Sequence, residues 1–240
     1  MPLKRAIRHA RKKGSLWVRL LDLARLVLTA EGRSILWTRV VRQDEVHQTT
    51  AYTRAERYPL LFELAAALAP RSNRILSFGC STGEELLALR RRFGEAEIVG
   101  VEINARSRRL AARRVAADAR TLVVDPRFLS GSFDLIFALS VLQREPHKIA
   151  QMDLQDLSSH YPYERFDAAI RLLADALVPG GLLCVVNAQY RIEDSSSGCQ
   201  FEAIAQSAPM AEPLFAPDGR RLEGAIGRTL FRKVLVNPSS

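Results

Sequence analysis

The stretch ILSFGCSTGEELLAL, residues 75–89, constrains the fold of this chain more than any other. An apolar run, residues 75–78, leads into a turn bounded by Gly79 and Gly83, and helix-forming residues follow. Glycine lets the backbone turn sharply and lets a ligand approach the amides. The unpaired N–H groups and positive dipole end of a helix start favour an anionic group. This order of segments predicts the ligand-binding corner of a doubly wound α/β sheet.

Two overlapping capping boxes mark the start of the predicted helix. Ser81 with Glu84, and Thr82 with Glu85, both have the Ser/Thr-x-x-Glu spacing in which a hydroxyl and a carboxylate satisfy orphan backbone N–H groups. We therefore expect a side-chain cap in the turn and a helix from residue 83 to about residue 93.

Strand and helix signals alternate from residue 74 onward, which predicts a parallel sheet with crossover helices. The strands are expected at residues 74–78, 97–101, 121–124, 133–139 and 182–186, and the helices at 53–68, 83–93, 106–117 and 163–177. An irregular stretch is expected at 143–161, a short helix at 201–206, and a hairpin of strands at 213–216 and 229–236. The fold class is α/β: a doubly wound, mostly parallel Rossmann-like sheet with an antiparallel last strand, preceded by an N-terminal helical extension.

The positive charge of the chain lies in its N-terminal part. Residues 1–42 hold 11 Lys and Arg against Asp22 and Glu31, a net of +9, which equals the net charge of all 240 residues. We expect two parts: a basic amphipathic helical extension, residues 1–47, and a catalytic domain, residues 48–240. Such an extension can contact an acidic partner or a membrane surface, or it can be a solvated face.

The extension does not have the pattern of a signal peptide or a spanning helix. Arg19, Asp22 and Arg25 interrupt the apolar run 16–30, and their spacing of three places them on one stripe of an amphipathic helix. Gly32 and Arg33 are expected to end this pattern before a second apolar patch, residues 35–41. Three cysteines without metal-ligand spacing suggest neither a structural zinc nor disulfides, and they fit a cytoplasmic protein.

The glycine turn does not fit the two common phosphate-binding motifs. Gly79 and Gly83 are spaced as GxxxG, so the GxGxxG fingerprint fails, and no Lys-Ser/Thr pair follows, so the P-loop fails. Glu102 ends the second predicted strand, 23 residues after Gly79. A carboxylate at that place can accept both ribose hydroxyls of an adenosine. An adenosine-containing cofactor is therefore expected.

In the order of its segments, the chain resembles the class I S-adenosylmethionine-dependent methyltransferases. The segments that carry the resemblance are TTAYTRAERYPLLFEL (49–64), SFGCSTGEE (77–85), IVGVEIN (98–104), VVD (123–125), SFDLIFALSVL (132–142) and LVPGGLL (177–183). Within this class, the CSTGEE string is most similar to the chemotaxis-type protein-glutamate methyltransferases. The resemblance covers residues 48–190 and implies S-adenosylmethionine as the cofactor, with no metal.

The resemblance also implies a set of cofactor-binding residues. The turn would pass the methionine part, Glu102 would hold the ribose, Asp125 would flank the adenine, and Ser140 and Val141 would border the transferred methyl. Arg54 would reach the methionine carboxylate, with Arg57 as a competitor. The full set is Gly79, Cys80, Ser81, Gly83, Glu84, Glu102, Asp125, Ser140, Val141 and Arg54.

The methyl acceptor is less constrained by the sequence. The class commonly has an acid at the position of Ser77, and the Asn-Pro-Pro-Tyr string of planar-nitrogen methyltransferases is missing after the fourth strand. A small-molecule or protein acceptor is expected, with a chemotaxis-type protein carboxyl O-methyltransferase and a non-catalytic cofactor-binding scaffold as alternatives. Specific nucleic-acid binding is disfavoured, because the basic extension has only two tryptophans to stack on bases.

Candidate catalytic residues gather in the stretch after the fourth strand, which would act as a lid. A general base is needed only if the acceptor loses a proton late in the reaction. The candidates are Glu145, His147, His160, Tyr161 and Tyr163, with Tyr190 and Arg191 on the acceptor side. Each can equally be an ordinary loop residue.

Overall fold

The computed structural model describes residues 27–48, 57–205, 213–225 and 227–235. The chain divides into two compact units, Met1–Gln43 and Asp44–Ser240, and each is described by itself. In the first unit, helix α3 (Ala30–Val41) begins at Thr29, whose Oγ1 accepts from the Gly32 N–H at 2.9 Å. The predicted break at Gly32 and Arg33 is therefore wrong, because this cap draws both residues into the helix. The predicted amphipathic helix lies almost wholly outside the described residues.

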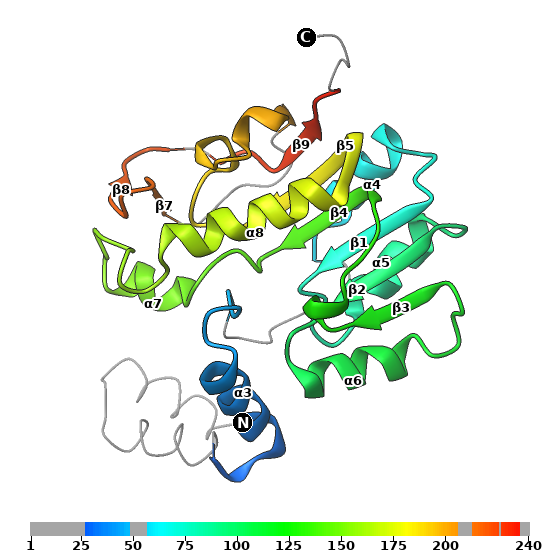
Figure 1. Cartoon of the computed structure of the whole chain (residues 1–240), viewed down its shortest axis with the longest axis horizontal. Helices are drawn as coiled ribbons and strands as arrows, with labels where there is room; N and C mark the ends of the chain where they lie inside the picture. The colour runs from blue at the N-terminus through cyan, green and yellow to red at the C-terminus, as the bar shows by residue number, and fades with distance from the viewer. Residues whose placement is uncertain (1–26, 49–56, 206–212, 226, 236–240) are drawn as a thin grey trace, which may run out of the picture. The chain divides into compact units, whose positions relative to one another are not determined.

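The second unit is built on a seven-stranded sheet of order β3-β2-β1-β4-β5-β9-β6 (Figure 1). Its strands are β1 (Arg74–Phe78), β2 (Glu97–Val101), β3 (Thr121–Val124), β4 (Phe133–Leu139), β5 (Leu177–Val186), β6 (Phe201–Ala205) and β9 (Leu230–Lys233). The first five strands pair in parallel, and β9 runs antiparallel between β5 and β6. The predicted fold class is confirmed, and β1 to β4 have the predicted bounds.

The C-terminal part differs from the prediction in two respects. The segment expected as a short helix at 201–206 is strand β6, because its backbone pairs with β9 and Phe201 packs against Phe231. The expected hairpin partners are also wrong. Strand β7 (Leu214–Phe215) pairs with β8 (Arg221–Leu222), whereas β9 enters the main sheet.

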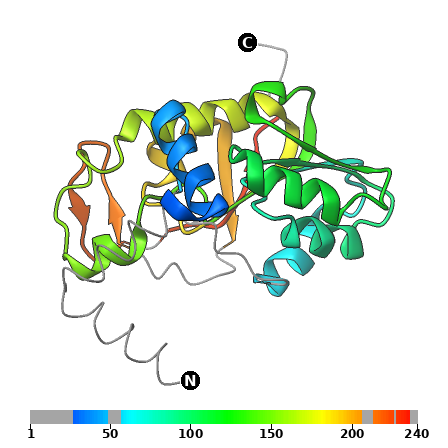
Figure 2. The ribbon, with the colours of Figure 1, turned by 90° about the horizontal axis from the view of Figure 1, so that it is seen from below.

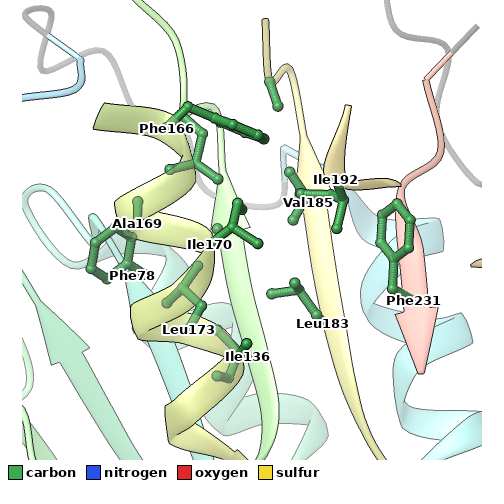
Figure 3. Packing of buried hydrophobic residues seen from close by; sticks show 14 of the residues in the cluster. Phe78, Ile136, Phe166, Ala169, Ile170, Leu173, Leu183, Val185, Ile192 and Phe231 are labelled. Atoms are coloured by element: carbon green, nitrogen blue, oxygen red, sulfur yellow. The ribbon is translucent and has the colours of Figure 1, made fainter. Parts of the chain in front are cut away.

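Helices cover both faces of the sheet. They are α4 (Pro59–Leu68), α5 (Glu84–Arg92), α6 (Ala105–Arg114), α7 (Pro146–Gln151) and α8 (Tyr163–Ala176). Alternate residues along each strand face opposite clusters: Leu76 and Ile136 pack with α8, whereas Ile75 and Leu135 pack with α4 and α5. Figure 3 shows side chains of α8 directed toward Ile136 of β4 and toward Leu183 and Val185 of β5. Burial on both faces explains why these strands are near-continuous apolar runs.

The helix starts depend on backbone conformation as well as on side chains. Helix α5 is capped by Gly83 in the left-handed conformation, and no side chain caps it, so the capping-box prediction is wrong. Helix α6 has a side-chain cap, Asn104 Oδ1, which accepts from Arg106 N and Ser107 N. Helix α4 begins at Pro59. The preceding residues 53–56 of the predicted helix lie outside the described chain.

The stretch after β4 contains α7 and lies beside the β7–β8 hairpin (Figures 1 and 2). The N–H of Leu157 donates to the Gly219 carbonyl at 2.9 Å, and the N–H of Arg221 donates to the Gln155 carbonyl at 3.0 Å. The stretch after β4 and the β7–β8 hairpin, which are far apart in sequence, thus form one substructure. Within the described ranges, no helix is both long enough and apolar enough to cross a membrane.

Candidate functional site

The turn after β1 is fixed to β2 by its backbone. The N–H groups of Gly79 and Cys80 both donate to the Val101 carbonyl, at 2.8 and 3.0 Å. Gly79 has a φ of +80°, and a Cβ at this position would lie 2.6 Å from Val141 Cγ2. Only glycine fits there. The side chain of Cys80 is buried among the residues that pack on α5, so Cys80 contributes its backbone to the turn.

Ser81 stands out in this turn because its hydroxyl has no partner. Its φ is +51°, and its Oγ is buried without a hydrogen bond in the part of the chain that the structure describes. Gly83 has a φ of +89°, and a Cβ on it would lie 3.0 Å from the Ala111 Cα of α6. The second glycine therefore serves close packing of the turn against α6, and the Ser81 hydroxyl is left available to a ligand.

Glu102 joins the ends of β1 and β2. Its Oε2 accepts from the Ser81 N–H at 2.9 Å, and its Oε1 accepts from the Asn104 N–H at 2.7 Å. Burial raises the pKa of Glu102, and these two N–H groups oppose the rise. A carboxylate offers about four lone-pair sites, so lone pairs remain for further donors. The geometry suits a ligand with two adjacent hydroxyls.

The two glutamates at the start of α5 point to different partners. Glu84 pairs with Arg114 of α6 at 2.5 Å, and its Oε2 accepts from the Thr82 hydroxyl at 2.7 Å. Glu85 instead accepts from the Ser77 hydroxyl of β1 at 2.8 Å. Burial raises the pKa of Glu85 to about 7, against the smaller opposing effects of the Ser77 hydrogen bond and the Arg57 charge. The structure thus brings the carboxyl of Glu85, which was not among the predicted site residues, to Ser77.

Asp125 follows β3 and is nearly saturated by arginines. Its Oδ1 accepts from the N–H and the Nε–H of Arg127, at 3.1 and 3.0 Å, and its Oδ2 lies 3.1 Å from Arg108 Nη1. The residue is 3% exposed, whereas Arg127 is 65% exposed by side chain. Of the two arginine side chains that hold the Asp125 carboxylate, that of Arg127 is the more exposed and can be displaced more easily by a ligand.

A polar cluster that the sequence analysis did not predict lies at the carboxyl ends of β4 and β5. Ser140 Oγ is 2.9 Å from Tyr58 Oη, and the Asn187 amide donates to both hydroxyl oxygens, at 2.9 and 3.1 Å. Arg57 Nε donates to Tyr58 Oη at 3.3 Å. Ser140 itself was predicted. Asn187 directly follows an apolar strand, which is the signal that pointed to Glu102 and would have found it.

Three of the candidate catalytic residues lie away from this cluster, on the substructure around α7. Glu145 caps α7 and pairs with Lys148 at 3.0 Å. His147 is exposed on α7, and His160 Nδ1 lies 3.0 Å from the Ser159 hydroxyl. The structure does not bring these three side chains together.

Tyr161 is fully buried and bonds a histidine that the sequence analysis missed. Its hydroxyl lies 2.6 Å from Nδ1 of His47, whose ring stands 6.3 Å from the Phe78 ring at the end of β1. Burial, with the Arg165 and Arg144 charges, lowers the pKa of His47 to about 4, and burial raises the pKa of Tyr161. Both groups are therefore neutral near pH 7, and neither is a ready base.

The remaining predicted residues have structural partners or cannot be placed. Tyr163 donates to the Asp194 carbonyl at 2.5 Å, and Arg191 pairs with the Asp194 carboxylate at 2.7 Å. Tyr190 is buried, and its hydroxyl donates to the Tyr161 carbonyl at 2.6 Å. Arg54 lies outside the described residues.

Comparison with known proteins gives a family match. A family model described as "Methyltransferase domain" matches residues 50–222. No curated protein sequence matches the chain significantly.

Solved structures that match the chain include two methyltransferases and the protein TrmN. CalS10, an amino pentose methyltransferase from Micromonospora echinaspora, is 19% identical with a TM-score of 0.43, over 66% of this chain and 58% of its own. The N-methyltransferase NodS from Bradyrhizobium japonicum is 16% identical with a TM-score of 0.44, over 75% and 99%. TrmN from Thermus thermophilus is 15% identical with a TM-score of 0.48, over 77% and 51%.

Several of these matches cover only part of the other protein. In three of the matching structures, CalS10 among them, the aligned region spans only 41% to 58% of the other chain's length. At these identities and TM-scores, the likenesses carry no argument about the substrate.

Proposed function

We propose that this chain, which belongs to the methyltransferase domain family, moves a methyl group from S-adenosylmethionine to a small-molecule or protein acceptor. The observation that carries the proposal is the unpartnered, buried hydroxyl of Ser81 beside the Glu102 carboxylate. A buried hydroxyl without a partner is costly unless a ligand supplies one. The ribose of the cofactor would supply hydroxyls at this position, so the residues present fit the group.

Each part of the site has a proposed role in holding the cofactor. Glu102 would accept from the two ribose hydroxyls with its free lone pairs, and the turn from Gly79 to Gly83 would pass the methionine part. Glu85 is better placed than Glu84 to serve the methionine ammonium, because Glu84 is paired with Arg114. Asp125 would receive the adenine amine after the Arg127 side chain swings away.

The protein's part in the reaction is chiefly positioning. The bound cofactor supplies a methyl group that its sulfonium already activates. The carboxyl ends of β1, β4 and β5 would hold the reacting groups together, and correct placement alone can lower a barrier by about 7–11 kcal/mol. His47 and Tyr161 are neutral near pH 7 and are poor bases, so neither of them would deprotonate the acceptor.

A second candidate is a chemotaxis-type O-methyltransferase that acts on protein glutamate. One observation favours it: the CSTGEE string of the turn after β1, which resembles that of this family. A carboxylate acceptor is already deprotonated near pH 7, so it would need no base.

Transfer of a labelled methyl group tests the proposed function. The protein would be incubated with methyl-labelled S-adenosylmethionine and a cell extract, and the extract would then be separated into small-molecule and protein fractions. We expect label in one fraction, lost with Glu102→Ala and kept with Glu97→Ala, a half-exposed acid on the same strand. Cofactor binding without any transfer would contradict the enzyme and favour a cofactor-binding scaffold.

A further inference from the structure

The polar cluster at the ends of β4 and β5 has a defined hydrogen-bond direction. We name it the Tyr58 cluster and define it as Arg57, Tyr58, Ser140 and Asn187. The guanidinium of Arg57 and the amide of Asn187 both donate to Tyr58 Oη, so the lone pairs of that oxygen are in use. Tyr58 Oη therefore has no lone pair left to accept a hydrogen bond from the Ser140 hydroxyl. The 2.9 Å contact between the two hydroxyls is therefore a donation from Tyr58 to Ser140.

The same count of donors and acceptors at Ser140 leaves its hydroxyl hydrogen without an acceptor among the described residues. Ser140 Oγ accepts from the Tyr58 hydroxyl and from the Asn187 amide at 2.9 Å, which uses both of its lone pairs. Its own O–H has no acceptor in the described part of the chain, although Ser140 is only 7% exposed. The amide nitrogen of Asn187 cannot accept it. A buried donor of this kind needs a partner from outside the protein.

The backbone holds this donor at the expected ligand crevice. Ser140 and Asn187 have φ values of +58° and +56°, a strained conformation for residues other than glycine, and such strain tends to cluster at functional sites. The Ser140 N–H donates to the Val186 carbonyl at 2.8 Å, and Gln143 Nε2 donates to the Ser140 carbonyl at 3.1 Å. The next residue, Val141, packs against Gly79 of the β1 turn. The residue that carries the hydroxyl is thus the chain neighbour of one that contacts the turn.

We infer that Ser140 donates a hydrogen bond to a ligand oxygen, and that Tyr58 and Asn187 are the positioning residues that direct this hydroxyl outward. The positive charge of Arg57 at the other end of the chain of hydrogen bonds strengthens the donor, because a charge-assisted bond polarises the bonds that follow it. The ligand chemistry is an oxygen lone pair, such as a carboxylate or carbonyl oxygen, and an ammonium group is excluded. Two sources are possible: the methionine carboxylate of the cofactor, or an oxygen of the methyl acceptor. In naming these sources, the inference rests on the proposed function.

Calorimetry with two cofactor fragments distinguishes the sources. S-Adenosylhomocysteine carries the amino-acid carboxylate, and 5′-deoxy-5′-methylthioadenosine lacks it. The variants are Ser140→Ala, which removes the donor, and Asn187→Asp, which keeps the shape but accepts hydrogens and so turns the Ser140 hydroxyl inward. Ser132→Ala, an exposed serine just before β4, is the matched control.

If the oxygen belongs to the methionine carboxylate, both variants weaken S-adenosylhomocysteine binding about tenfold and leave methylthioadenosine binding unchanged. If it belongs to the acceptor, both fragments bind as to wild type, and labelled-methyl transfer to the cell extract falls about tenfold. The inference is overturned if binding and transfer are both unchanged, if both fragments weaken equally, or if Asn187→Asp behaves as wild type. Failure of both fragments to bind wild type would instead sink the proposed function itself.

Discussion

At the scale of single residues, burial changes the protonation of Glu85, an acid next to the β1 turn. Glu85 is held by the Ser77 hydroxyl at 2.8 Å, and burial raises its pKa from 4.5 to about 7. The folded protein therefore keeps a proton between pH 4.5 and 7 that the unfolded chain has lost. Stability contributed by this group is full below pH 4.5 and is lost as the pH rises to 7.

Replacing Glu85 with glutamine removes this pH dependence. Glutamine keeps an oxygen that accepts from the Ser77 hydroxyl but never ionises. We expect Glu85→Gln to gain about 2–3 kcal/mol of unfolding free energy relative to wild type between pH 5 and pH 8. Urea denaturation of the ligand-free protein at both pH values measures the gain. An equal difference between the two proteins at both pH values would show that Glu85 is not buried as described.

The sequence predicts some of the site residues and misses others for a physical reason. Glu102 was predicted from a local pattern, because an acid directly after a buried parallel strand lies at the carboxyl edge of the sheet, where ligands bind. Tyr58 and His47 were missed because their roles depend on partners 82 and 114 residues away, at Ser140 and Tyr161. No local pattern encodes such contacts.

At the scale of elements, the first four strands of the parallel sheet were the easiest to predict. Strands β1 to β4 are apolar runs, and their bounds agree with the prediction. Strand β6 was predicted as a helix, β7 was paired with the wrong strand and β8 was not predicted, because strand pairing decides the structure of such short segments. Helix α5 likewise starts at a left-handed glycine instead of a capping box.

The start of α5 can be tested by adding a single methyl group. Gly83→Ala places a Cβ 3.0 Å from the Ala111 Cα and forces alanine to a φ of +89°. We expect a loss of about 1–3 kcal/mol of unfolding free energy by urea denaturation. Gly94→Ala is the matched control, since nothing lies within 4 Å of its added Cβ. If both variants lose the same amount, the close approach of the α5 turn to α6 is not what requires glycine.

At the scale of the whole molecule, charge and site belong to different parts of the chain. The site residues all lie in the unit Asp44–Ser240, while residues 1–42 carry a net charge of +9. The rest of the chain has no net charge, since its 24 basic residues are matched by 24 acidic ones. The expected role of the basic extension, contact with an acidic partner or membrane surface, is a separate proposal from the chemistry.

A shortened chain, residues 44–240, separates the two properties. It keeps the segment with Val46, whose carbonyl accepts from Arg144 at 2.9 Å. We expect it to bind S-adenosylhomocysteine as the full chain does, but to lose sedimentation with phosphatidylserine vesicles. Binding of the full chain should weaken at high salt, because exposed charges are screened. Equal sedimentation of both chains, or none by the full chain, would contradict a role of the extension at anionic surfaces.

The binding of S-adenosylmethionine through Glu102 is the central claim, and isothermal titration calorimetry tests it directly. Wild type should bind both S-adenosylmethionine and S-adenosylhomocysteine. Glu102→Ala should weaken both by about 1–3 kcal/mol, because the ribose hydrogen bonds and the tie to the Ser81 N–H are lost together. Glu97→Ala, at the other end of β2, should bind as wild type. Unchanged affinity in Glu102→Ala would contradict the role of this carboxylate, and no binding to wild type would contradict the function.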